Sequence, residues 1–258
     1  NAPAPVAALF AIMTKVGIYA ILRMQALAFS DGPLAGLGAD LLWWLALVTL
    51  ALAAIGALSA SRLGGLVAYL VVMSVGTLVA ALSVGEPQTV GPALYYLIHS
   101  TLICAALFLL CDLLRRSRGD SGDRLESGPP LVHGKWLGAA FFAAAVAVVG
   151  LPPLSGFIGK LALLQAVPSA PYWTLLLLAG LAGLVGMSRA GSTLFWRVHG
   201  EVVDRKLGKR RVIPMLALLL ASPALALAAE PLLQLCAGVA GQLADPTIYI
   251  RAVLGGAS

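Results

Sequence analysis

Two lysines and one histidine stand inside long apolar stretches of this 258-residue chain. Lys15 and Lys160 carry amines and His99 carries an imidazole, so each side chain can take up and release one proton. An ionised group at the centre of a membrane costs roughly 3 kcal/mol on insertion scales, so a protein that keeps one usually holds it with specific partners. The three residues therefore predict proton transfer inside a membrane, with Lys15, His99 and Lys160 as the relay groups.

Lys15 lies near the middle of its apolar stretch. Its position after Val6 corresponds to a depth of about 13 Å at the rise of a helix, close to the centre of a hydrocarbon core about 30 Å thick. Arg23 stands nearer the end of the same stretch, from where its long side chain can reach the interface. The alternative for Lys15 is a structural pairing with a neighbouring helix.

Lys160 follows a run that should interrupt its helix, the segment 150–156 with sequence GLPPLSG. Pro152 and Pro153 lack backbone N–H groups and leave carbonyls without helical donors. In a membrane those carbonyls must be buried in protein or face a wet cavity, and a broken helix beside a buried charge is typical of ion paths in transporters. A simple proline kink with a lysine at its edge is the alternative.

His99 gives the weaker signal, because a neutral histidine is cheap to bury and often serves only packing or hydrogen bonding. Polar neighbours for a hydrated relay are nevertheless present on the same stretch: Tyr95, Tyr96, Ser100 and Thr101. Together with two buried lysines, they favour the relay role.

The remaining polar residues predict no catalytic, cofactor or metal site. Arg189 cannot usefully release a proton and is expected to anchor a helix end or a lipid, or to bond backbone carbonyls. Asp112 should form an ion pair with Arg115 or Arg116. Cys104 and Cys111 would lie about 10 Å apart on one helix, too far for a disulfide. No glycine-rich nucleotide loop and no paired His/Cys cluster occurs, so we expect no cofactor, no metal and no enzyme active site.

Composition places these residues in an integral membrane protein. Hydrophobic residues make up 60% of the chain and charged residues 11%, with a mean hydropathy of +0.95. The net charge of +6 could suggest nucleic acid, but the bases gather in short loops between apolar segments, which argues against a nucleic-acid partner. We expect one all-α transmembrane domain over residues 1–258. The chain opens without Met and without a charged region before its first apolar stretch, so we expect a fragment rather than a signal peptide.

Seven apolar segments are long enough to span a membrane, and an eighth is shorter. Pro92 is expected at the first position of the fourth. The shorter piece should be interfacial or re-entrant. The expected spans are 6–28, 41–60, 63–84, 93–114, 136–167 (broken at Pro152-Pro153), 172–196 and 212–227, followed by the short piece 232–243.

Basic residues alternate between the loops. They follow the second, fourth and sixth segments, whereas the loops after the first, third and fifth carry no Lys or Arg. By the positive-inside rule, the chain should enter from the cytoplasm and end outside. The bases concerned are Arg62, then Arg115, Arg116, Arg118, Arg124 and Lys135, then Arg197, Arg205, Lys206, Lys209, Arg210 and Arg211.

Several stretches together resemble the antiporter-like membrane subunits shared by respiratory complex I and the Mrp multisubunit cation/proton antiporters. The opening Ala-Pro pairs and the run 13–23 match one family helix. Ala68-Tyr69 with Ser74 and Gly76, Ile98-His99-Ser100 with 105–110, and 150–153 with 156–160 match three others. The C-terminal stretches 242–246 and 249–255 resemble the D-type member of the Mrp antiporters, including their potassium/proton (Pha) form.

The resemblance implies a fourteen-helix parent with two inverted five-helix repeats, of which this chain would be the second half. Lys15 then matches the family's central lysine, His99 its bridging histidine and Lys160 the lysine of its broken helix. This sequence departs at Gly64-Gly65, where the family has a basic pair, and at Ser74, where some relatives carry histidine, so water should contribute more to the relay. The expected supporting residues are Thr14, Tyr19, Ser74, Tyr96, Ser100, Pro152, Pro153, Ser155 and Gly156.

Three functions remain open. The first is a proton-translocating subunit of a multisubunit Na+/H+ or K+/H+ antiporter in a bacterial inner membrane, partnered by other subunits, lipid, protons and the exchanged cation. The second is a proton-pumping subunit of NADH-quinone oxidoreductase or a related hydrogenase, and the third is a structural subunit without transport. The stretch 249–255 favours the first, and the buried Lys15 and Lys160 argue against the third.

Overall fold

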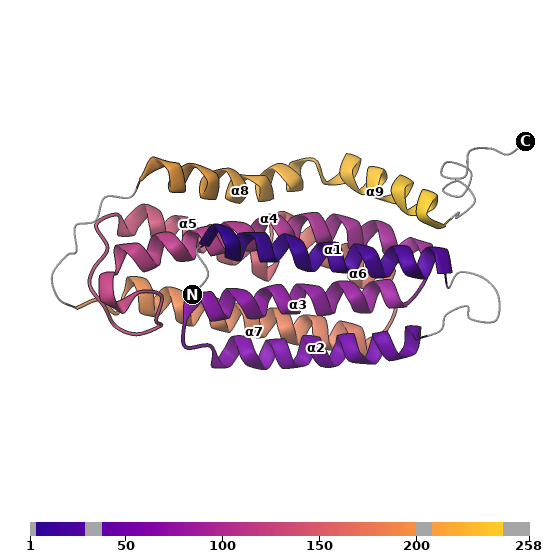
Figure 1. Cartoon of the computed structure of the whole chain (residues 1–258), viewed down its shortest axis with the longest axis horizontal. Coiled ribbons are helices and arrows are strands. Elements are labelled where there is room, and N and C mark those ends of the chain that lie inside the picture. The colour runs from indigo at the N-terminus through magenta and orange to yellow at the C-terminus, as the bar shows by residue number, and fades with distance from the viewer. Residues whose placement is uncertain (1–3, 29–37, 200–207, 245–258) are drawn as a thin grey trace, which may run out of the picture.

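The computed structural model describes residues 4–28, 38–199 and 208–244, and within these ranges regular structure is helical, without a β-strand. Most helices run side by side along the long axis of the molecule (Figure 1). Their bounds are α1 Ala4–Ala28, α2 Ala39–Ser59, α3 Leu63–Ser83, α4 Pro87–Ser117, η1 Gly119–Ser121, α5 Gly134–Val149, α6 Ser155–Ala166, α7 Ala170–Phe195, α8 Lys209–Leu227 and α9 Ala229–Ala244.

α4 is the central helix. It contacts α1, α3, α5, α6, α8 and α9, while α2 packs on α3 and α7 at the opposite side of the molecule. α8 and α9 follow one another along one flank of the bundle (Figure 1). The interior is filled by small and branched apolar residues, such as Leu50, Leu66 and Leu107, none of which exposes more than 1% of its surface. A residue on α4 can therefore reach side chains from most of the other helices.

The start of α4 differs from the position expected from the sequence. We expected Pro92 at the first helical position, whereas α4 begins at Pro87 and Pro92 lies inside it. Pro92 would otherwise bond the carbonyl of Gln88, so only one hydrogen bond near the helix end is lost, and Pro87 itself occupies the position where a missing N–H costs nothing.

Five helices are long and apolar enough to cross a membrane: α2, α3, α4, α7 and, from residue 210, α8. α5 is apolar but shorter, and it ends at Val149, before α6 begins at Ser155. Many large apolar side chains face outward, among them Leu41, Leu52 and Ile55 on α2. Such a surface suits lipid better than water.

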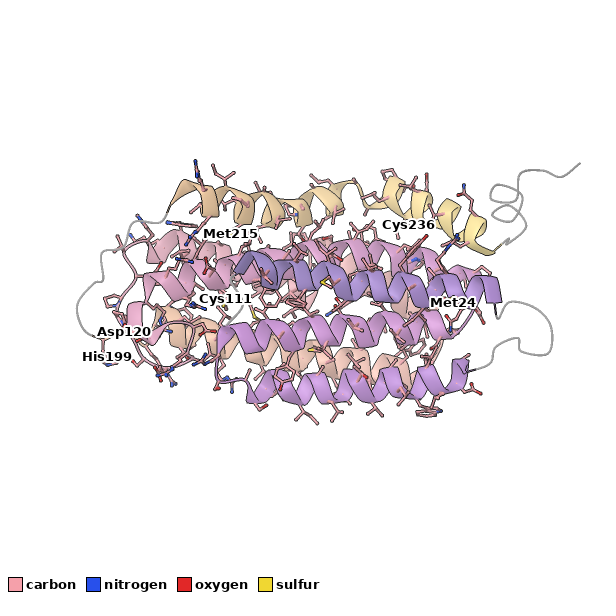
Figure 2. All side chains as sticks on the ribbon, viewed as in Figure 1. Met24, Cys111, Asp120, His199, Met215 and Cys236 are labelled. Atoms are coloured by element: carbon pink, nitrogen blue, oxygen red, sulfur yellow. The ribbon has the colours of Figure 1, made fainter. Side chains whose placement is uncertain are left out.

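The loops rich in arginine meet at one end of the bundle. Short backbone pairings join Arg62 to Arg124 and Gly128 to Val198, so the three connections after α2, α4 and α7 lie together. Asp120 and His199 are labelled at this end in Figure 2. The cysteines 104, 111 and 236 are free and buried. The C-terminal stretch 249–255 and the bases Arg205 and Lys206 lie outside the described residues.

Candidate functional site

Lys15 sits on the buried face of α1. Ala11, Lys15, Ile18 and Leu22 recur at helical spacing, and all four are buried, whereas Met13 and Val16 face outward. The Lys15 amine donates to the Ser74 hydroxyl oxygen on α3 at 2.5 Å. Ser74 in turn donates to the Val71 carbonyl at 2.7 Å, which leaves its oxygen oriented to accept from the amine. The apolar stripe of α1 thus carries one cation into the interior and delivers it to a hydroxyl.

The Lys160 side chain is held by the non-helical turn between α5 and α6. Its amine donates to the Val149 carbonyl at 2.6 Å. In an unbroken helix that carbonyl would accept from residue 153, but Pro153 has no N–H to give. Gly150 supports the turn with a φ of 84°, a conformation that glycine adopts without strain. The prolines therefore free the acceptor that binds the lysine.

His99 on α4 is bonded at Nδ1 and lies beside a carbonyl at Nε2. Nδ1 lies 2.7 Å from the Ser155 hydroxyl at the start of α6. The Ala147 carbonyl of α5 and His99 Nε2 both border the position that a Cβ would take on Gly156, so the carbonyl stands on the Nε2 side of the ring. That carbonyl is available because the N–H of Leu151, its ordinary helical donor, bonds Val146 instead. The same turn between α5 and α6 thus orients both the histidine and the lysine.

A small cavity joins these groups. Its volume is about 20 Å³, which is enough for about one water molecule. Ser74, His99, Ser100 and Lys160 all line it, and Tyr96 adds an aromatic wall whose ring centroid lies 6.0 Å from that of His99. Lys15 reaches this space through Ser74. Ser74, which binds Lys15, thus lies with His99 and Lys160 around a single water-sized space between α3, α4 and α6.

Not every residue expected at the site lies in it. Thr14 bonds the Ala11 carbonyl of its own helix at 3.0 Å, and Tyr19 is 49% exposed. Pro152 and Pro153 lie exposed on the turn and act through the carbonyls they free. Gly156 is buried directly beside His99, where its lack of a side chain leaves room for the ring.

Sequence reasoning missed Ser222. This buried α8 residue places its hydroxyl 2.9 Å from that of Ser155, and so extends the polar contacts of His99 to a further helix. The signal available was a serine followed by Pro223 within an otherwise apolar segment. Thr77 and Cys104 also line the small cavity and were not expected there.

Two other charged side chains expected from the sequence to have structural roles are Arg189 and Asp112. Arg189 donates to the Ala60 carbonyl at 2.7 Å, one of the roles expected from the sequence. Asp112 pairs with Arg116 at 2.8 Å and with Arg211 of α8 at 3.7 Å. Among the described residues, no group of three or more His, Cys, Asp and Glu side chains could hold a metal ion.

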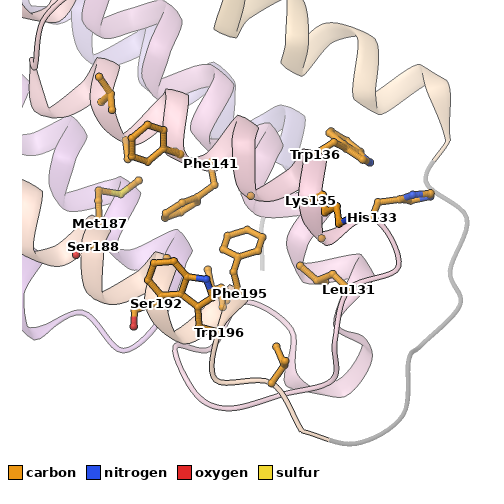
Figure 3. Close-up of a pocket in the computed structure, with 18 of the residues that line it drawn as sticks. Leu131, His133, Lys135, Trp136, Phe141, Met187, Ser188, Ser192, Phe195 and Trp196 are labelled. Atoms are coloured by element: carbon orange, nitrogen blue, oxygen red, sulfur yellow. The ribbon is translucent and has the colours of Figure 1, made fainter.

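A larger cavity of about 1000 Å³ lies elsewhere, between α5 and α7 near the arginine-rich end. Figure 3 shows its walls, with Phe141, Phe195 and Met187 among the labelled residues and Lys135 at one side. Lys15, His99 and Lys160 do not line it. The small cavity is the better candidate for the functional site, because His99 and Lys160 line it and Lys15 bonds Ser74 in its wall.

Comparison with known proteins shows which family the chain matches. The family described as "NADH:quinone oxidoreductase/Mrp antiporter, TM" matches residues 1–186. A probable K(+)/H(+) antiporter subunit, of the D type, from Rhizobium meliloti is 34% identical over 97% of this chain and 52% of its own length. A Na(+)/H(+) antiporter subunit of the same type from Alkalihalophilus pseudofirmus is 35% identical over 98% of this chain and 52% of its own.

The fold has a counterpart in a solved assembly. A chain in the structure of the Mrp complex from Dietzia sp. DQ12-45-1b superposes with a TM-score of 0.77, at 24% identity, over 95% of this chain and 55% of that one. This chain therefore spans about half the length of the curated relatives it matches.

Proposed function

This chain belongs to the NADH:quinone oxidoreductase/Mrp antiporter transmembrane family, and on that premise we propose that it is a proton-translocating part of a multisubunit cation/proton antiporter. The resemblance seen in the motifs is confirmed by these matches, and the relatives named as antiporter subunits support a transporter component rather than an enzyme. Activity, exchanged cation and partners are part of the proposal, because the chain matches half of each relative.

The proposed path runs from Lys15 through Ser74 and the water-sized cavity to His99 and Lys160. The main support is that residues of α3, α4 and α6 meet around this one space, with hydroxyl and carbonyl groups already bonded to each amine. Amines, imidazole, hydroxyls and water can each exchange donor and acceptor roles as a proton moves. A cavity for about one water supplies the link that direct contacts leave out.

In the proposed membrane arrangement, α1, α2, α3, α4, α7 and α8 each span the bilayer and α5 with α6 forms one broken span. Helices α2 to α7 form one five-span repeat, and α9 lies at the interface. The arginine-rich end faces the cytoplasm by the positive-inside rule, so the N-terminal end is cytoplasmic and the C-terminus outside a bacterial inner membrane. The freed Val149 carbonyl accepts from Lys160 and so is satisfied inside the protein, as a membrane requires.

The exchanged cation is sodium or potassium, since relatives are named for each. The partners are other subunits of the same complex, because those relatives are named as subunits. A second function has support in the family description, which includes NADH:quinone oxidoreductase. In that case the same path would serve a redox-driven pump, and proton movement would follow quinone reduction rather than added sodium or potassium.

The decisive variant is Lys160→Ala in the complete complex. Removing a lysine from the membrane interior lowers the cost of insertion, so assembly should persist while cation-dependent proton movement in everted vesicles falls to background. Lys160→Arg should fail as well, because arginine keeps its charge but does not release its proton. Lys135→Ala, at the exposed start of α5, is the matched control. Normal transport by Lys160→Ala in an assembled complex would exclude this lysine from the path.

A further inference from the structure

A line of three buried polar groups leads from the candidate site to α8. His99 Nδ1 lies 2.7 Å from the Ser155 hydroxyl, and that hydroxyl lies 2.9 Å from the hydroxyl of Ser222. Their residues expose 1%, 0% and 2% of their surfaces. Buried polar groups at such distances depend on one another for hydrogen bonding, because no solvent replaces a lost partner. The proposed path from Lys15 to Lys160 makes no use of Ser222.

The carbonyl of Ala147 sets the direction of these hydrogen bonds. A Cβ added at Gly156 would collide with the Ala147 oxygen and lie 2.9 Å from His99 Nε2, so this carbonyl stands on the Nε2 side of the ring. Because a carbonyl only accepts, this position favours the neutral ring that carries its proton on Nε2, and Nδ1 of that ring accepts. Ser155 therefore donates to Nδ1, and Ser222 donates to Ser155.

When His99 takes up a proton, the direction of each hydrogen bond in this line must reverse. A protonated Nδ1 donates to Ser155, the Ser155 hydroxyl turns to donate to Ser222, and the Ser222 hydroxyl then needs an acceptor of its own. The cation Lys160 on α6 lines the same cavity as His99, and the cation Lys15 on α1 is bonded to Ser74 in its wall. Since both disfavour a further positive charge, the protonated ring depends on its hydrogen bonds.

The sequence of α8 offers that acceptor. Pro223 has no N–H, so the Leu219 carbonyl four residues earlier lacks its helical donor. The same carbonyl lies three residues before Ser222, a spacing that helical serines bridge readily. Ser74 and Ser83 on α3 do so here, donating to carbonyls three residues back at 2.7 and 2.9 Å.

We propose that Ser222, with the Leu219 carbonyl freed by Pro223, is a positioning residue that lets His99 accept a proton at Nδ1. This inference rests on the proposed function. In the neutral state Ser222 donates to Ser155, and in the protonated state it accepts from Ser155 and donates to Leu219. No covalent bond changes except that of the transferred proton, and α8 becomes part of the proton machinery rather than a lipid-facing cover.

The test is the pH profile of cation-dependent proton movement in vesicles that contain the complete complex. Ser222→Ala should shift the profile toward acid by about one pH unit, because a hydrogen bond that supports a charged group is lost. Ser222→Thr retains the hydroxyl and should keep the parental profile. Pro223→Ala restores the helical N–H, competes for the Leu219 carbonyl and should shift the profile in the same direction by less. Ser83→Ala is the control for removing a buried serine hydroxyl.

Coincident profiles for Ser222→Ala and the parent would overturn the inference, as would an equal shift in Ser222→Thr, which would indicate packing. If Ser222→Ala does not assemble, the Pro223→Ala profile decides in its place. His99→Ala separates this inference from the proposed function. Unimpaired transport in that variant counts against the proposed function itself, whereas impaired transport with an unshifted Ser222→Ala profile counts only against the role of α8.

Discussion

The Lys15 amine and the Ser74 hydroxyl oxygen, 59 positions apart in sequence, meet at 2.5 Å in the interior of the bundle. Ser74 lines the small cavity that His99 and Lys160 share, so this contact is where the first lysine joins the rest of the site. The Ser74 hydroxyl donates its hydrogen bond to the Val71 carbonyl, so its oxygen accepts the hydrogen bond from Lys15. In the described part of the chain, Ser74 is thus the hydrogen-bond link between α1 and the cavity.

Ser74→Ala should therefore reduce cation-dependent proton movement about thirtyfold, since a hydrogen bond to a charged group contributes about 2 kcal/mol. Ser74→His should retain more transport, because an imidazole both accepts and donates. Both variants would be compared in everted vesicles at equal amounts of assembled complex, with Ser83→Ala as the control on the same helix. Full transport by Ser74→Ala would show that Lys15 is connected by another route.

The sequence predicted the helices better than the contacts between them. Runs of apolar residues long enough to span a membrane give the segments directly, and two adjacent prolines indicate where α5 must end. The pattern of apolar residues does not show which side chain on another helix will hydrogen-bond to a buried polar group. Ser74 and Lys15 meet only because α1 packs against α3, and Ser222 reaches Ser155 only because α8 crosses the start of α6.

The residues expected to support the site fall into two groups, those that face the interior of the bundle and those that do not. Tyr96, Ser100 and Ser155 lie on faces that point inward, whereas Thr14 and Tyr19 belong to the same motif as Lys15 but turn away from the buried stripe of α1. Helical spacing alone could not have separated them, because Thr14 is three residues after Ala11 and Tyr19 is four after Lys15, which places both at the edges of the buried stripe. The Ala147 and Val149 carbonyls carry no sequence signal beyond the prolines that follow them.

His99→Ala should lower transport without abolishing it. The alanine leaves space beside a cavity that already has room for about one water, and water can replace part of the relay between Ser74 and Lys160. The measurement is the rate of cation-dependent proton movement, with Lys160→Ala set alongside as the variant expected to reach background. Equal, complete loss in both would show that water does not bridge the gap and that the imidazole is obligatory.

Gly156→Ala should destabilise the break between α5 and α6. A Cβ at this position would collide with the Ala147 carbonyl and stand 2.9 Å from His99 Nε2, so backbone or ring must move. Overpacking of this kind costs about 1–3 kcal/mol. We expect a lower melting temperature of the purified complex and reduced transport. Gly17→Ala on α1, where an added Cβ meets nothing within 4 Å, should change neither, and an unchanged Gly156→Ala complex would mean that the break is looser than the structure shows.

Arg118 stabilises the arginine-rich end of the bundle from the inside. Directly after α4, it exposes only 1% of its surface and donates to the carbonyls of Arg124 and Glu126, both at 2.6 Å. Burial lowers the pKa of its guanidinium, with Glu126 and Asp123 acting the other way, but arginine remains charged at physiological pH. The loop it holds pairs with residues of the two neighbouring connections, Arg62 and Val198.

Arg118→Met should therefore remove the hydrogen bonds to the carbonyls of Arg124 and Glu126, at a cost of about 1–3 kcal/mol each in free energy of unfolding. Arg118→Lys should recover little, because one ammonium cannot reproduce the planar fork that serves both oxygens. The melting temperature of the complex should fall in both variants. Transport by the fraction that remains assembled should keep its pH profile, since Arg118 does not line the small cavity. Arg197→Met, at an exposed position of the same end, is the matched control, and equal melting temperatures for the two methionine variants would show that the buried hydrogen bonds of Arg118 do not stabilise this end.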